Sequence, residues 1–263
     1  MKMKTFFRSV CLSLLVLFSM QASAADLMMG LKTLPVQDAG RVKPFDTFAR
    51  ESLSMIYGRE VYQAIRNGPG GSEKVGDKKG ATEIVMTWML QPEAWQGVPL
   101  FELSFGALKN ALKLPAEEKY FSYEKLMNNE NISNVMQELS SRREAKEKLN
   151  PYYQAVQRLE TQLITFREIA AGRMMRVMPV APAPAAWASL SELEGDFQTA
   201  FIDITKSFIS VLAATTDVAG GDEKRKAASQ VLTNSVQSFE EKIRAAQPDL
   251  YPSLDKVKLE VHY

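Results

Sequence analysis

The sequence predicts a mostly α-helical fold, a helical bundle of about five to seven helices with a small terminal β-sheet formed by an N-terminal hairpin and a C-terminal strand. Three observations support this prediction. Apolar side chains recur every three or four residues from Leu149 to Ala170, which is the spacing of one face of an α-helix. The same spacing returns in two stretches between 191 and 246. Short alternating segments at both ends, within 33–44 and 257–261, favour strands.

Residues 1–24 have the composition of a secretory signal peptide. A basic start precedes the apolar stretch Val10–Phe18 and the small residues Ala22-Ser23-Ala24. We therefore expect one periplasmic helical domain over 25–263, peripheral to the inner membrane; if the signal is kept, it becomes a single N-terminal anchor. Cys11 is the only cysteine and lies in the signal. The mature chain can then form neither a disulfide nor a Cys-x-x-Cys-His haem attachment.

Charge and hydropathy exclude two classes of protein. The whole chain carries a formal net charge of +1, and removing the three signal cations Lys2, Lys4 and Arg8 leaves −2. This balance gives no indication of nucleic-acid binding. After the signal, no apolar run approaches the ~20 residues that span a bilayer, since the longest candidate, Phe201–Ala214, contains two charged residues.

The first elements are predicted from turn and capping residues. Extended segments over Thr33–Gln37 and Arg41–Pro44 flank a tight turn, because Asp38-Ala39-Gly40 has the residue types of a hairpin loop. Asp46 or Thr47 is expected to cap a helix that begins at Phe48 and runs toward Asn67, with a bend near Gly58. The glycine-rich, charged residues 67–80 are expected to form a flexible surface loop.

Helical spacing places the remaining elements. We expect helices over Ala81–Leu90 and Val98–Leu112, a helix after the N-cap Ser122, and a long helix around 149–170 that continues the charged run 141–148. Residues 179–188 form a proline/alanine connector anchored by Trp187. A capping box at Ser191 and Glu194 then starts a helix through Leu212, followed by a last helix over Glu223–Ala246. Strand 257–261 is expected to pair with the N-terminal hairpin.

Four charged residues form the candidate site. Arg41, Lys43, Asp46 and Arg50 place three cations and one anion within ten residues, a suitable surface for a carboxylate-bearing ligand or an acidic partner. The alternative is that each of them serves only the hairpin and the helix cap.

Catalytic and metal sites have little support in the sequence. The only histidine, His262, lies next to the last residue, which rules out internal histidine triads and multi-histidine zinc sites. Met174, Met175 and Met178 are close enough to suggest a soft-metal or haem-iron ligand set, but core packing is the more common use of methionine. We therefore expect neither an enzyme nor a directly bound cofactor.

The stretch LPVQDAGRVKPFDTFAR, Leu34–Arg50, resembles a phrase that opens the extracytoplasmic insert domain of fused System II (ResB/CcsA-type) cytochrome c biogenesis proteins. Shorter similarities lie at 91–95, at 120–126 and around Trp187, so the resemblance extends over about Leu34–Tyr263. It implies an accessory domain for c-type cytochrome maturation that docks on a membrane haem exporter and cytochrome c synthase. Apocytochrome c is a further possible partner, and haem association would be indirect, through the synthase.

A second hypothesis comes from another class. The chain could be a free-standing periplasmic chaperone or envelope protein-binding module that needs no synthase. In either case Arg41, Lys43, Asp46 and Arg50 are the predicted partner-binding residues, with binding and positioning as the mechanism.

Overall fold

The computed structural model describes residues 26–182, 186–217 and 221–252, of which 59% are helical and 16% are in strands. The helical elements are η1 (Asp26–Met28), α2 (Met29–Lys32), α3 (Phe45–Tyr57), α4 (Ala81–Leu90), α5 (Pro92–Gln96), α6 (Gly106–Ala111), α7 (Tyr123–Met127), α8 (Ile132–Glu144), α9 (Pro151–Ala170), η2 (Leu190–Glu192), α10 (Gly195–Thr216) and α11 (Gly221–Ala246). The strands are β1 (Pro35–Asp38), β2 (Arg41–Pro44), β3 (Val61–Gly68), β4 (Gly71–Gly80), β5 (Phe101–Glu102), β6 (Tyr120–Phe121), β7 (Arg176–Met178) and β8 (Ala188–Ser189).

The mostly helical class is confirmed, but the predicted bundle of five to seven helices with one terminal sheet is wrong. Within the described residues there are ten α-helices and three small sheets, of four, two and two strands. Several of the helices have only four to six residues. Such short helices contain too few turns for an apolar period to be recognised in the sequence.

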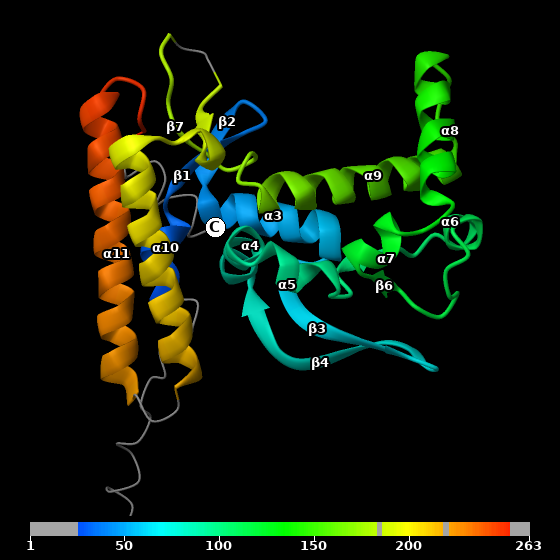
Figure 1. The fold of residues 1–263 in the computed structure, drawn as a ribbon, viewed down its shortest axis with the longest axis horizontal. Helices are drawn as coiled ribbons and strands as arrows, with labels where there is room; N and C mark the ends of the chain where they lie inside the picture. Colours follow the sequence, from blue (N-terminus) through cyan, green and yellow to red (C-terminus); the bar gives the residue numbers. More distant parts are fainter. Residues whose placement is uncertain (1–25, 183–185, 218–220, 253–263) are drawn as a thin grey trace, which may run out of the picture.

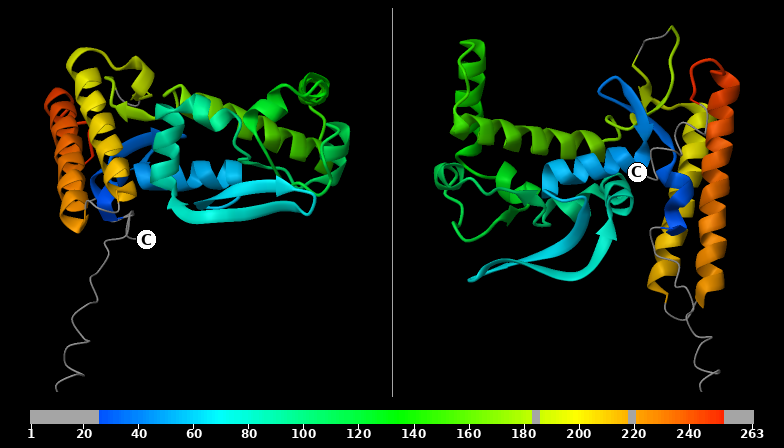
Figure 2. Two further views of the ribbon diagram at one scale, coloured as in Figure 1. Left: turned by 60° about the horizontal axis from the view of Figure 1, so that its bottom comes forward. Right: turned by 180° about the vertical axis from the view of Figure 1, so that it is seen from behind.

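The elements are arranged in two perpendicular parts (Figure 1). The antiparallel helices α10 and α11 stand at one end, and α3 and α9 run away from them across the molecule. Both views of Figure 2 keep α10 and α11 side by side, and the right view shows α8 projecting at the far end. The sheet that contains β1 lies where the two parts meet (Figure 1). No helix in the described ranges is long and apolar enough to cross a membrane.

The N-terminal hairpin lies where the sequence predicts it. Asp38 pairs with Arg41 across a two-residue turn in which Ala39 (φ 49°) and Gly40 (φ 78°) are both left-handed, as a tight antiparallel hairpin requires. The full strand order is β2-β1-β7-β8. The strand next to the hairpin is β7, which pairs with β1 at Gln37 and Arg176. The strand expected over 257–261 lies outside the described residues.

The chain after α3 differs from the prediction. α3 ends at Gly58, whose φ of +77° stops the helix, and residues up to 80 form the antiparallel β3–β4 ribbon. The predicted flexible loop over 67–80 is thus the end of β3, the turn and the second strand of this ribbon. Ser72 explains the order: its Oγ accepts hydrogen bonds from the main-chain N–H groups of Lys119 (2.8 Å) and Tyr120 (3.3 Å). Such an anchor is distant in sequence and invisible to local propensity.

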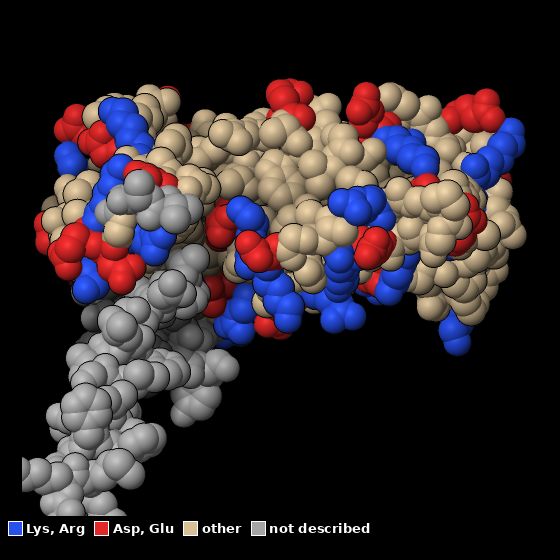
Figure 3. Space-filling view, turned by 90° about the horizontal axis from the view of Figure 1, so that it is seen from below, with Lys and Arg blue, Asp and Glu red and all other residues tan. Residues whose placement is uncertain are grey.

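The ribbon is a surface element whose charges alternate in sign. Seen from below, where the ribbon lies in Figure 1, lysine and arginine side chains are interspersed with carboxylates (Figure 3). β4 accounts for part of this pattern, with Lys74, Lys78 and Lys79 beside Glu73 and Asp77. Charged side chains of this kind protect a sheet edge from pairing with another chain.

Residues 98–112 also depart from the predicted helix. They form β5 and the short helix α6, because the N–H groups of Leu100 and Leu103 donate to Phe121 and Lys119 on the β6 side. By contrast, α4 has the predicted bounds, and α7 has the predicted N-cap, with Ser122 Oγ accepting from Lys125 N at 3.1 Å. These two features depend on neighbouring residues, whereas β5 depends on pairing with a strand distant in sequence.

Two helix starts correct the sequence analysis. The charged run 141–148 does not continue the long helix: α8 ends at Glu144 and α9 starts at Pro151, with Asn150 as its N-cap. The predicted capping box at Ser191 and Glu194 is wrong: the capping box is formed by Ser189 and Glu192 and starts the short helix η2, whereas α10 begins at Gly195 without a side-chain cap. The connector anchor is confirmed, since Trp187 is buried and stacks on Tyr251 at 5.8 Å.

Candidate functional site

Lys43, one of the four predicted contact residues, is buried rather than presented to a partner. Its side chain is 7% exposed, and its Nζ donates to Asp38 Oδ2 at 2.8 Å and Glu51 Oε2 at 2.5 Å. Burial opposes the charge, but the hydrogen bonds that Lys43 donates to Asp38 and Glu51 outweigh it and raise the pKa of Lys43. The ammonium thus ties β1 and β2 to α3.

Asp46 and Arg50 form a second internal network. Asp46 Oδ1 accepts from Thr82 Oγ1 at 2.9 Å, and its Oδ2 lies 3.1 Å from Arg50 Nε, one helical turn further on. Arg50 Nη1 lies 3.6 Å from Glu60 Oε2. These contacts connect α3 with α4 and with the residues before β3. The predicted capping role of Asp46 or Thr47 is wrong, because α3 begins at Phe45, whose N–H donates to Leu34 O.

The four residues therefore do not form one surface of three cations. Arg41 is exposed beside the hairpin turn, Arg50 is 32% exposed, and Lys43 lies inside. Each of the two inner cations also pairs with a more exposed carboxylate. Lys43 pairs with Glu51, which is 55% exposed, and Arg50 pairs with Glu60, which is 59% exposed. On this side, α3 presents acidic groups whose cationic partners lie behind them.

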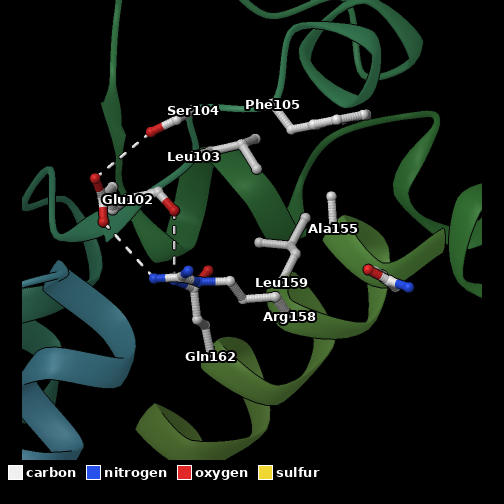
Figure 4. Close-up of a pocket in the computed structure, with 9 residues that line it drawn as sticks. Glu102, Leu103, Ser104, Phe105, Ala155, Arg158, Leu159 and Gln162 are labelled. Atoms are coloured by element: carbon white, nitrogen blue, oxygen red, sulfur yellow. Dashed lines mark hydrogen bonds and ion pairs between the residues drawn. The ribbon is translucent and has the colours of Figure 1, made fainter. Parts of the chain in front are cut away.

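Glu51 and Glu60 line an open hollow between α3 and α9. Its volume is about 610 Å³, and its other lining residues are Ser54, Met55, Gln154, Gln157, Arg158 and Thr161. A second hollow of about 410 Å³ shares Gln154 and Arg158 with it and is further lined by Glu102, Leu103, Ser104, Phe105, Ala155, Leu159 and Gln162 (Figure 4). We call these two joined hollows the α3/α9 trough.

Gln162 fixes the floor of the trough. It is 1% exposed, and its Nε2 donates to the carbonyl oxygens of Met55 (3.0 Å), Ile56 (3.2 Å) and Glu102 (3.3 Å). The first two are carbonyls at the end of α3, which lack partners within that helix. One side chain therefore holds α3, α9 and β5 together, so the trough is formed before any ligand arrives.

Glu102 and Arg158 set the charge of the second hollow. Glu102 Oε1 lies 2.7 Å from Lys119 Nζ, and its Oε2 lies 3.7 Å from an Arg158 guanidinium nitrogen. Gly58 makes room for this carboxylate, because a Cβ there would lie 1.9 Å from Glu102 Oε2. Arg158 is 57% exposed, and Figure 4 shows its side chain on α9 facing Glu102.

The sequence analysis missed the trough residues. Gln162 carried a usable signal, because a polar residue interrupts the apolar stripe that contains Leu159, Leu163 and Phe166. Glu102 and Phe105 carried none, because they were placed in a helix that does not form.

The other sequence candidates contribute no assembled site. Met175 is buried in the core and Met178 belongs to β7, while His262 lies outside the described residues. Across the described ranges, no group of three or more histidine, cysteine, aspartate or glutamate side chains is placed to hold a metal ion.

The arrangement is suited to binding: a preformed trough, a partly paired guanidinium and exposed apolar side chains. Compared with known proteins, the chain matches no family model, and no curated protein is similar enough to be a relative.

Proposed function

We propose that this chain is an exported accessory domain for c-type cytochrome maturation that docks on a membrane haem exporter and cytochrome c synthase of the ResB/CcsA type. The observation that carries the proposal is the resemblance of Leu34–Arg50 to the phrase opening the insert domains of the fused proteins. In support, these residues form one continuous unit, the β1–β2 hairpin and the first half of α3. The domain would act in the periplasm, at the inner membrane, by positioning rather than by bond-making.

The geometry narrows the proposed contact surface to the hairpin turn. Arg41 is the one residue of the original four whose side chain is largely exposed, and it follows the exposed turn Ala39-Gly40. Lys43 and Asp46 form internal ion pairs, and Arg50, the partner of Asp46, is 32% exposed. Apocytochrome c could bind elsewhere on the domain, and any association with haem would pass through the synthase.

Affinity purification tests the docking proposal. The tagged protein is purified from detergent-solubilised membranes as wild type, as Arg41→Glu and as the matched control Arg66→Glu, which reverses an exposed cation on β3. We expect a cytochrome c synthase to co-purify with wild type and with Arg66→Glu and to be lost with Arg41→Glu. Absence of a synthase from all three preparations would contradict the proposal.

A specific feature favours the second candidate, a free-standing periplasmic chaperone or envelope protein-binding module. The α3/α9 trough carries two exposed large apolar side chains, Met55 (41%) and Phe105 (37%). Exposed apolar groups in a concave surface are a common feature of protein-binding sites. Recovery of varied exported proteins, unchanged by Arg41→Glu but reduced by Phe105→Ser, would support this role instead.

A further inference from the structure

We infer that the α3/α9 trough binds an extended segment of another polypeptide, with a side-chain carboxylate at Arg158 and an apolar side chain against Leu103 and Phe105. This inference goes beyond the proposed function, because the trough is lined by residues other than those of the hairpin turn. It can hold for a synthase-docking domain or for a free-standing binding module.

The charge balance at Arg158 points to a carboxylate. Glu102 already has a close cationic partner, since Lys119 Nζ lies 2.7 Å from it, whereas Arg158 lies 3.7 Å away. That distance is too long for a hydrogen bond, and the Arg158 guanidinium makes none within the described residues. Its planar set of N–H donors fits a carboxylate in a two-bond arrangement.

The acidic residues Glu51 and Glu60 line the first hollow, so this preference for a carboxylate belongs to the second hollow. Glu51 is paired with Lys43 at 2.5 Å, and Glu60 lies 3.6 Å from Arg50. Because Lys43 also pairs with Asp38 and Arg50 also pairs with Asp46, the first hollow keeps an excess of carboxylates. In the second hollow the balance is reversed, since Glu102 has two cations, Lys119 and Arg158. An incoming carboxylate meets a cation with free donors there.

Apolar and polar contacts beside Arg158 suit a peptide. Leu103 and Leu159 are buried side chains that line the second hollow, and Phe105 is 37% exposed at its rim. Exposed Gln157 lines the first hollow and makes no side-chain hydrogen bond among the described residues, so its amide is available to a peptide backbone. Two open hollows in series favour an extended chain over a small ligand, which enclosed pockets hold better.

Titration of the isotope-labelled mature protein by NMR tests the inference. The probe is a Gly/Ser-based decapeptide with blocked termini that contains Leu-Phe followed by one Asp, and the matched probe carries Asn instead. We expect the Asp peptide to bind at least about fivefold more tightly, a modest value because Arg158 is half-exposed. Arg158→Gln should abolish that difference, and Arg158→Lys should retain part of it.

The control variant is Arg167→Gln, on the same helix and 56% exposed against 57% for Arg158, which should leave the preference for Asp intact. Phe105→Ser should weaken both peptides about equally. Equal affinities for the Asp and Asn peptides, or no saturable binding of either, would overturn the inference. Sodium dodecanoate that shifts the same amide signals with higher affinity than the Asp peptide would also overturn it, in favour of a small amphiphile.

Discussion

Replacing Lys43 by methionine tests whether this residue stabilises the fold rather than binding a partner. Removing one partner of a fully buried ion pair costs about 3–5 kcal/mol, whereas an exposed pair contributes about 0–1 kcal/mol. The Lys43 side chain is 7% exposed, but its partners Asp38 and Glu51 are 26% and 55% exposed. We therefore expect Lys43→Met to lower the free energy of unfolding by about 2 kcal/mol, between these two limits.

Urea denaturation followed by circular dichroism measures this loss, with Arg41→Met as the matched control on the same strand. Arg41 is exposed, so its replacement should change stability by less than about 0.5 kcal/mol. Because the folded-state pKa of Lys43 is raised, its contribution should be complete below its unfolded pKa, near 10.5. The contribution should then be lost as the pH rises through the folded-state value. A loss for Lys43→Met no larger than that for Arg41→Met would refute the reasoning.

Two further predictions concern the stability of the fold. Gly58→Ala should destabilise the protein by about 2–3 kcal/mol, because it combines left-handed strain with a clash against Glu102. The control is Gly40→Ala, which has nearly the same φ but no atom within 4 Å of the new Cβ. It should cost only about 1–2 kcal/mol in the same urea assay. Arg173→Gln should remove the hydrogen bonds that, against the opposing effect of burial, hold the pKa of Glu168 at about 2. The wild type should then exceed the variant in stability above pH 4.5 and lose that advantage as the pH falls toward 2, which acid titrations of the two proteins would show.

Elements specified by residues close in sequence could be predicted. Helix α4 is an apolar segment with a proline after its end, and the β1–β2 turn contains the Ala39-Gly40 pair in left-handed geometry. In each case the residues that fix the conformation are neighbours along the chain. Local propensity is therefore enough to place the element.

Elements that depend on distant partners could not be predicted. β4 consists of glycine, serine and charged residues, a composition typical of loops. It is ordered by pairing with β3 and by the contacts of Ser72 with the segment entering β6. β5 is likewise only two residues long and exists because it pairs with β6. Stabilisation from such contacts leaves no periodic signal in the sequence.

The candidate site likewise depends on contacts between residues distant in sequence, which the sequence does not reveal. The cluster of charges at Arg41, Lys43, Asp46 and Arg50 could be recognised in the sequence. Whether these side chains face solvent or form internal ion pairs depends on the groups that the fold places beside them. Asp38 and Glu51 turn Lys43 inward, and Thr82 engages Asp46 from a helix 36 residues away. Arg158 could not be recognised as a site residue in the sequence, because arginine is common on the solvent-exposed face of a long helix. Its distinction arises from Glu102 and Phe105, which only the fold brings near.

These placements change what the Leu34–Arg50 phrase can say about function. Its apolar members Leu34, Val36, Phe45 and Ala49 are completely buried, and Lys43 and Asp46 serve internal pairs. Most of the phrase is therefore required by the hairpin and α3, and any protein that uses this hairpin–helix unit would need similar residues, whatever it binds. The resemblance then indicates a shared local structure more directly than a shared partner. Discrimination between the two candidate functions must therefore come from an exposed position of the phrase, which is Arg41 at the turn.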